Sequence, residues 1–136
     1  MIFIKLPGVS EMSKKKVLIV DDEKSLSELI TESLMIFGDY SVESAHDGRE
    51  AFEKYKTFLP DIVIMDIEMP VMDGYESSHK IKSFDPNARI LMLTGNPGDF
   101  RARRTIEEGI ALTLIQKPVK LMDLNRTISE NLPVQF

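Results

Sequence analysis

The chain has 136 residues, which corresponds to one domain large enough to form a core without disulfides. It contains no cysteine and two histidines, so disulfides, thiolate metal sites and histidine-rich metal sites are excluded. With 17 basic and 22 acidic residues the net charge is −5, which argues against direct binding of nucleic acid. No apolar run reaches the roughly 18 residues of a membrane-spanning helix.

The start of the chain differs from the rest. Residues 1–9 are apolar apart from one lysine, and Met12 resembles a second start. The ordered features of a secretory signal are missing, which together with the lack of cysteine predicts a cytoplasmic protein. We expect residues 1–13 to be a disordered N-terminal extension without function, and residues 14–133 to form the domain.

Four short apolar runs and one mixed segment predict five strands. The apolar runs suit strands that are buried on both faces of a sheet. The mixed segment, from Tyr40 to Glu43, predicts an edge strand. In chain order the predicted strands are residues 17–20, 40–43, 62–65, 89–93 and 112–115.

Apolar residues at helical spacing predict a helix after each strand. The first stripe covers residues 26–37 and the last covers residues 121–132. Asp47 and Asp73 are each followed three residues later by glutamate, the spacing of a capping box, and predict the starts of the second and third helices. Asn96, followed by a proline, predicts the N-cap of the fourth helix.

Strand and helix therefore alternate five times. This alternation predicts an α/β domain with a parallel sheet and helices on both faces. A doubly wound sheet of this kind binds its ligands outside the carboxyl ends of the strands. No glycine-rich loop follows the first strand, so the sequence has neither a P-loop nor a dinucleotide-binding fingerprint.

Chemically active side chains stand at four of the predicted strand ends. Asp21 and Asp22 follow the first strand, Asp66 the third, Thr94 the fourth and Lys117 the fifth. Three converging carboxylates repel one another unless a cation joins them, and one lysine does not neutralise three. Oxygen ligands without sulfur or imidazole favour Mg²⁺ or Mn²⁺, which pair with phosphate. A carboxylate can itself be the nucleophile and form an acyl phosphate.

These motifs together resemble the receiver domains of response regulators, over about residues 15–132. Asp21-Asp22 resembles the family's acidic pair, and Thr94 and Lys117-Pro118 match its switch hydroxyl and its lysine-proline. The family's phosphoacceptor segment, with its Met-Pro and Asp-Gly pairs, is matched in this chain by Asp66-Ile67-Glu68-Met69-Pro70-Val71-Met72-Asp73-Gly74. The resemblance implies a flavodoxin-like (βα)5 fold with a doubly wound, five-stranded parallel sheet and strand order 2-1-3-4-5.

The resemblance also implies a role for each site residue. Asp66 is the implied phosphoacceptor, Lys117 the cation that pairs with the phosphoryl group, and Thr94 the hydroxyl that moves inward to bond it. Catalysis of this kind is positioning and charge neutralisation. Asp22 is implied to bind Mg²⁺ directly and Asp21 largely through water. The full implied Mg²⁺ set is Asp21, Asp22, Asp66 and the backbone carbonyl of Glu68.

The implied function is that of a phosphoacceptor switch in two-component signalling, not that of an enzyme. Its chemistry is limited to self-phosphorylation from small phosphodonors and self-dephosphorylation. The implied partners are a sensor histidine kinase or phosphotransfer protein, and a downstream protein target. The target is expected on the face formed by the fourth helix, fifth strand and fifth helix. A phosphorylation-dependent homodimer is a further expectation, and neither nucleic acid nor a membrane is expected as a direct partner.

Three positions depart from the family's pattern. Leu114 stands three residues before Lys117, where the family has tyrosine or phenylalanine, so the usual aromatic rotamer switch lacks its ring. Gly95 replaces the usual alanine and leaves open space beside the site. Glu68 adds a carboxylate close to the expected acyl phosphate. The last two changes bear on the lifetime of that phosphate.

Two other classes of function fit part of this pattern. A Mg²⁺-dependent phosphatase with an aspartyl nucleophile would need a second aspartate two residues after the first, where this chain has Glu68. A pseudo-receiver would dock to partners without accepting phosphate, which the intact set of acids, hydroxyl and lysine argues against.

The remaining charged and titratable residues give weaker indications of function. Arg101, Arg103 and Arg104 form a basic cluster that fits a solvated helix face or, alternatively, a docking surface for an acidic partner. His46 and His79 are interpreted as surface residues without a chemical role.

Overall fold

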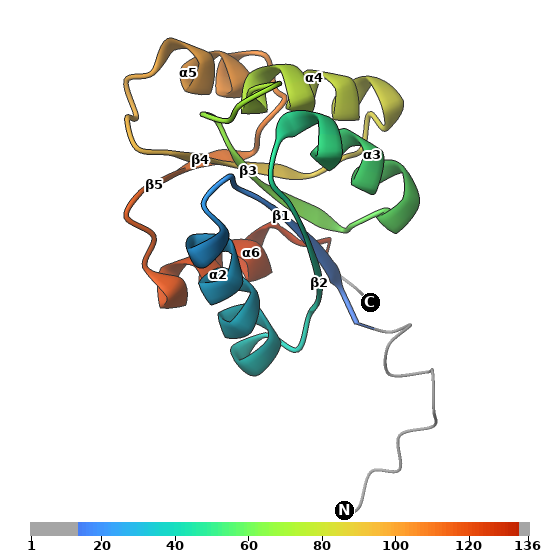
Figure 1. Cartoon of the computed structure of the whole chain (residues 1–136), viewed down its shortest axis with the longest axis vertical. Helices are drawn as coiled ribbons and strands as arrows, with labels where there is room; N and C mark the ends of the chain where they lie inside the picture. Colours follow the sequence, from blue (N-terminus) through green and yellow to red (C-terminus); the bar gives the residue numbers. More distant parts are fainter. Residues whose placement is uncertain (1–13, 134–136) are drawn as a thin grey trace, which may run out of the picture.

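The computed structural model describes residues 14–133 as a five-stranded sheet with helices on both sides (Figure 1). Every neighbouring pair of strands is parallel, and their order is β2-β1-β3-β4-β5, which confirms the expected 2-1-3-4-5 topology. The strands are β1 (Lys16–Val20), β2 (Ser41–Ala45), β3 (Ile62–Asp66), β4 (Ile90–Thr94) and β5 (Thr113–Gln116). The helices are α2 (Lys24–Phe37), α3 (Gly48–Phe58), α4 (Gly74–Phe84), α5 (Phe100–Glu107) and α6 (Leu121–Asn131).

The sheet is covered on both faces, as its apolar strands predict. Helices α2 and α6 lie on one face, and α3, α4 and α5 lie on the other (Figure 1). Successive residues of a strand point to opposite faces, so Leu18 and Val20 join the core under α3, α4 and α5. Val17 and Ile19 join the core under α2 and α6. Strand β2 is only half-buried, in agreement with its predicted position at the edge.

The starts of α3 and α4 follow the capping pattern of the sequence. Asp47 accepts a hydrogen bond from the Glu50 N–H at 2.8 Å, and Asp73 accepts one from the Glu76 N–H at 2.9 Å. Each aspartate satisfies one of the backbone donors that a helix leaves free in its first turn. Gly38 is the C-cap of α2, and its N–H donates to the Leu34 carbonyl.

The start of the fourth helix was predicted wrongly. The N-cap of α5 is Asp99, not Asn96, because the Asp99 carboxylate accepts the backbone N–H groups of both Arg101 and Ala102. Asn96 instead forms a turn, in which its side-chain oxygen accepts the Gly98 N–H at 3.0 Å and its carbonyl accepts the Asp99 N–H at 2.9 Å. An asparagine that bonds the backbone two residues on competes with helix formation. The helix therefore begins four residues after Asn96.

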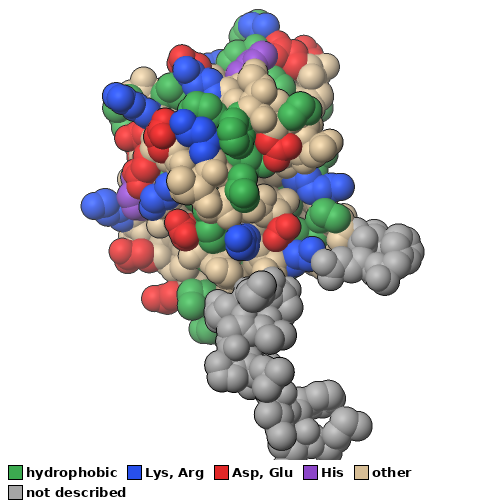
Figure 2. Space-filling view, turned by 90° about the vertical axis from the view of Figure 1, so that its right-hand side faces the viewer, with side chains coloured by type: hydrophobic (Ala, Val, Ile, Leu, Met, Phe, Trp, Pro, Cys, Tyr) green, Lys and Arg blue, Asp and Glu red, His purple; other side chains and the backbone are tan. Residues whose placement is uncertain are grey.

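Other ends of strands and helices differ from their predicted positions by a few residues. The second strand covers residues 41–45 and not 40–43, because Tyr40 packs into the core under α2 and pairing with β1 begins at Ser41. The prediction for residues 1–13 lies outside the described residues. Within residues 14–133, no helix has the length and apolarity needed to cross a membrane. Basic and acidic side chains are mixed over the face in Figure 2.

Candidate functional site

The carboxyl ends of β1 and β3 bring the predicted acids together. Asp21, Asp22 and Asp66 each offer a carboxylate oxygen, and these oxygens all lie within 4.8 Å of one another. Asp21 and Asp66 are buried, whereas Asp22 is exposed at the opening. Lys117 follows β5 and reaches this group: its Nζ lies 3.0 Å from Asp21 Oδ2 and 3.2 Å from Asp66 Oδ2.

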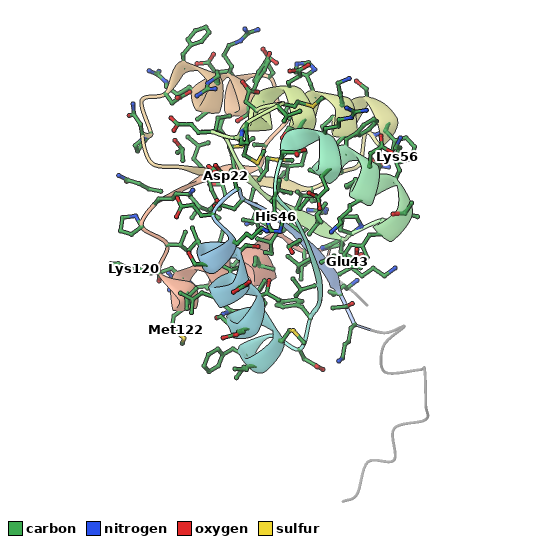
Figure 3. The ribbon with its side chains drawn as sticks, viewed as in Figure 1. Asp22, Glu43, His46, Lys56, Lys120 and Met122 are labelled. Atoms are coloured by element: carbon green, nitrogen blue, oxygen red, sulfur yellow. The ribbon has the colours of Figure 1, made fainter. Side chains whose placement is uncertain are left out.

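The backbone around Asp21 fixes this geometry. Its N–H donates to the Ala45 carbonyl at 3.1 Å, and its Oδ1 accepts the Glu23 N–H at 2.9 Å. His46 Nδ1 lies 3.0 Å from the Asp21 carbonyl oxygen, so Nδ1 is the donor of this pair. Figure 3 shows Asp22 and His46 at the same end of the sheet. The interpretation of His46 as a plain surface residue missed this contact, for which the sequence carries no local signal.

Burial and charge act together on the acidic group. The pKa of Asp66 is raised from an ordinary value of 3.8 to about 6, mainly by burial and also by the neighbouring Asp21 charge, against the opposing effect of Lys117. For Lys117, burial works to lower the pKa, but Asp21 and Asp66 outweigh it and the pKa is raised. The site therefore holds more negative charge than its one lysine balances.

The donor set fits a hard divalent cation. Among residues 14–133, the side chains grouped closely enough to hold a metal here are Asp21, Asp22 and Asp66, which offer carboxylate oxygens, and Asp22 stays exposed to water. Mg²⁺ prefers such oxygen ligands and keeps several of its waters. An open cleft above the acids is lined by Asp22, Glu23, Asp66, Glu68, Met69, Pro70, Gly95 and Lys117.

Thr94 lies at the end of β4 and is buried. Its hydroxyl donates to the Asn96 carbonyl at 2.8 Å and accepts the Asn96 N–H at 3.0 Å. The hydroxyl is therefore bonded to the β4–α5 loop. Gly95 lines the cleft, and a Cβ placed on it would have no atom within 4 Å, in line with the open space predicted at this position.

The loop between β3 and α4 is held tightly against Asp66. The Gly74 N–H donates to the Ile67 carbonyl at 2.9 Å, and a Cβ on Gly74 would lie 2.2 Å from the Asp66 carbonyl oxygen. Only glycine allows this approach. Val71 has a φ of 68° and sits between Pro70 and Met72, whose N–H donates to the Pro70 carbonyl at 2.7 Å. This is a strained γ-turn at the rim of the cleft.

Leu114 lies on β5, and the basic cluster of Arg101, Arg103 and Arg104 lies on α5. Leu114 is half-buried in the core beside α3, α4 and α5. Arg101 pairs with Asp73, Asp99 and Glu68, and Arg104 pairs with Glu108. Among the described residues, Arg103 is the member of the cluster for which no ion pair is found. Arg103 and Arg104 are exposed, in agreement with a solvated helix face, whereas Arg101 is half-buried beside its acidic partners.

The fold and the acidic edge define a doubly wound α/β domain that carries a cluster of three carboxylates able to hold a metal ion. The chain matches the model of the response regulator receiver domain over residues 17–129. The chain therefore belongs to the response-regulator receiver family, whose members act as phosphoacceptors in two-component signalling.

Individual relatives agree with this assignment. The chain is 37% identical to the chemotaxis protein CheY of Halobacterium salinarum over 116 residues, or 85% of this chain and 95% of that protein. A CheY-like receiver structure from Methanospirillum hungatei has a TM-score of 0.81 and 30% identity, covering 87% of this chain and 93% of that one. The CheX-CheY-BeF3-Mg complex of Borrelia burgdorferi has a TM-score of 0.78 and 34% identity, covering 88% of this chain and 90% of that one. Two other relatives are longer, and the chain spans 44% and 34% of their lengths.

Proposed function

We propose that this chain is a phosphorylation switch that receives a phosphoryl group on Asp66 from a sensor histidine kinase or a phosphotransfer protein. The observation that carries the proposal is the buried pair Asp21 and Asp66 bridged by Lys117, with the exposed Asp22 beside them. A buried carboxylate at an open cleft, next to a fixed cation, is a suitable nucleophile for an anionic phosphodonor.

Each side chain has a defined task in this transfer. Asp66 attacks phosphorus and forms the acyl phosphate, while the donor's leaving group departs from the opposite side. Lys117 pairs with an oxygen of the transferred group, since its ammonium already lies 3.2 Å from Asp66. Thr94 exchanges its bonds to Asn96 for one to the phosphoryl group, which links the site to the start of α5.

The proposed cofactor is Mg²⁺. Asp22 would hold it directly, Asp21 largely through water, and Asp66 and the backbone carbonyl of Glu68 would complete the protein ligands. The cation would neutralise the charge that develops on the phosphoryl oxygens. The three clustered carboxylates support this assignment, as does the similar CheY protein that forms a complex with BeF3 and Mg²⁺.

The proposed output surface is the face of α5, β5 and α6, the fourth helix, fifth strand and fifth helix of the domain. Phe100 at the start of α5 is 71% exposed, and β5 is the outer strand at its edge of the sheet. A downstream protein target or a second phosphorylated copy of this chain would bind there. The proposed setting is the cytoplasm, and the proposed domain is residues 14–133.

The test is mass spectrometry after incubation with acetyl phosphate and Mg²⁺. One phosphoryl adduct, labile to hydroxylamine, is expected on the unmodified chain and on an Asp123→Asn control, an exposed aspartate on α6. Asp66→Asn should give no adduct. A full adduct on the Asp66→Asn chain would reject Asp66 as acceptor, and the absence of any adduct on the unmodified chain would favour a pseudo-receiver. Steady turnover of a phosphate ester would favour the phosphatase.

A further inference from the structure

One guanidinium connects three acidic side chains beside the cleft. Arg101, in the first turn of α5, places Nη1 3.2 Å from Asp73 Oδ2 and Nη2 3.2 Å from Asp99 Oδ2. Nη2 also lies 3.8 Å from Glu68 Oε1. The Arg101 side chain is 39% exposed, so these contacts form at the rim of the cleft and not in the core.

Asp73 and Asp99 have the same bonding pattern. Each uses Oδ1 to cap a helix, Asp73 at the start of α4 and Asp99 at the start of α5. Each presents Oδ2 to Arg101. The planar fork of the guanidinium holds two carboxylates in a fixed geometry, whereas a lysine ammonium acts as a point charge on a flexible stem. Arg101 therefore joins the first turns of two helices whose caps are 26 residues apart in the chain, from position 73 to position 99.

The Asp73 end of this contact leads directly to Asp66. Asp73 precedes Gly74, whose N–H donates to the Ile67 carbonyl and whose position beside the Asp66 carbonyl oxygen leaves no room for a Cβ. A change in the first turn of α4 is thus transmitted to the backbone of the β3–α4 loop. The other end of the contact lies on α5, where Arg101 is five residues after Asn96, the loop residue that bonds Thr94.

We propose that Arg101 is a positioning residue for phosphotransfer, which ties α5 to the β3–α4 loop through Asp73 and balances the charge of Glu68 at the rim. The inference rests on the proposed phosphorylation of Asp66. Without Arg101, the carboxylates of Glu68, Asp73 and Asp99 would add to the negative charge of the acidic cluster, and their field would oppose the approach of an anionic phosphodonor. The loop would also lose its side-chain connection to α5.

The test compares Arg101→Gln with Arg103→Gln, which removes the same charge from an exposed position on the same helix. The first readout is the initial rate of phosphorylation by acetyl phosphate at low salt. Arg101→Gln should lower this rate about two- to fivefold, the range expected for one partly exposed ion-pair group. Added salt should bring the rates of Arg101→Gln and of the unmodified chain closer together, because it screens the charge. Arg103→Gln should keep the rate of the unmodified chain.

The second readout is the rate of amide hydrogen exchange over residues 67–73, measured on the chain without Mg²⁺ or phosphodonor. Arg101→Gln should speed this exchange, and Arg103→Gln should not. Arg101→Lys restores the charge but not the fork, so it should recover only part of the rate, and its exchange should stay faster than in the unmodified chain. Urea unfolding of each variant shows whether it is folded as a whole.

These readouts separate the two proposals. If the unmodified chain takes no phosphoryl group, the proposed function fails, while the exchange data still decide whether Arg101 holds the loop. If Arg101→Gln matches Arg103→Gln in rate and in exchange, the positioning role is overturned. Faster exchange with an unchanged rate would leave Arg101 a structural contact only and would also overturn it.

Discussion

Lys117 Nζ lies 3.0 Å from Asp21 Oδ2, a carboxylate that is fully buried. The same ammonium is 3.2 Å from Asp66, so one cation serves two buried acids. Breaking a buried ion pair by removing one partner destabilises a fold strongly, because the remaining charge has no partner. The lysine of the proposed site is therefore also a part of the fold's electrostatic balance.

The first prediction concerns this balance. Lys117→Met should lower the free energy of unfolding by about 3 kcal/mol at about pH 7.5, because it leaves two buried carboxylates facing each other. The loss should shrink towards about pH 5, since a proton then replaces the ammonium. Urea denaturation at both pH values measures it, and Lys120→Met, an exposed lysine three residues on, is the control. Equal stability of the two variants would show that the buried pair contributes nothing.

The second prediction follows from the raised pKa of Asp66, about 6 instead of 3.8. The folded state binds this proton more tightly than the unfolded state, so ionisation of Asp66 opposes folding and stability falls as the pH rises from about 4 through about 6. Asp66→Asn removes this loss. The variant should be more stable than the unmodified chain above pH 6, by on the order of 2 kcal/mol, and the gap should close towards pH 4.

Denaturation curves across that pH range, without divalent cations, test the Asp66 prediction. Asp123→Asn serves as the matched control, because the Asp123 carboxylate is exposed and pairs with Arg126 at the surface. Its stability should follow that of the unmodified chain at every pH. A constant offset between Asp66→Asn and the unmodified chain would show that the carboxylate keeps its ordinary pKa in the fold.

Local patterns were sufficient for most of the fold. The apolar strands and the caps at Asp47 and Asp73 depend on residues within one element, so the sequence predicts them directly. The strand order came from the family resemblance and not from periodicity. The start of α5 was predicted wrongly because Asn96 and Asp99 are both good capping residues, and only the surrounding hydrogen bonds decide between them.

The same distinction applies to the site. Asp21, Asp22, Asp66 and Lys117 stand at strand ends, and a parallel sheet brings such positions together whatever the loops do. The contact of Arg101 with Asp73 depends on side-chain conformations across 28 positions of the chain, which no local pattern encodes. His46 was missed for the same reason.

The third prediction concerns the metal. Asp22→Ala should remove most of the Mg²⁺ binding of the unphosphorylated chain, because Asp22 is the exposed acid of the cluster and a proposed direct ligand. Isothermal titration with Mg²⁺ measures the affinity. Glu28→Ala on the exposed face of α2 is the control and should bind as the unmodified chain does. An unchanged affinity of Asp22→Ala would place the metal elsewhere.

The fourth prediction uses two glycines with opposite surroundings. An alanine Cβ at Gly74 would lie 2.2 Å from the Asp66 carbonyl oxygen, so the backbone must move, whereas at Gly95 it would meet no atom within 4 Å. Gly74→Ala should lower the free energy of unfolding by about 2 kcal/mol or more and slow phosphorylation, and Gly95→Ala should change stability by less than about 0.5 kcal/mol. Thermal unfolding of both variants tests this, and equal losses would contradict the packing at Asp66.

The last prediction separates two routes from the site to the output face. The Thr94 hydroxyl is bonded twice to Asn96, so moving it to a phosphoryl group releases the β4–α5 loop. Leu114, at the position where the family has an aromatic ring, is a half-buried packing residue opposite Met92 in the neighbouring strand. It has no polar atom with which to bond a phosphoryl oxygen.

Thr94→Ala should therefore block the conformational response to phosphorylation, whereas Leu114→Ala should leave much of it. Only an interaction that differs between the two states can shift their populations, and the proposed bond of Thr94 to the phosphoryl group is such an interaction. Amide exchange across residues 95–116, with and without beryllofluoride and Mg²⁺, measures the response, and urea unfolding confirms that both variants are folded. A full response in Thr94→Ala would reject the hydroxyl route. Loss of the response in a stable Leu114→Ala chain would show that packing at β5 carries the signal instead.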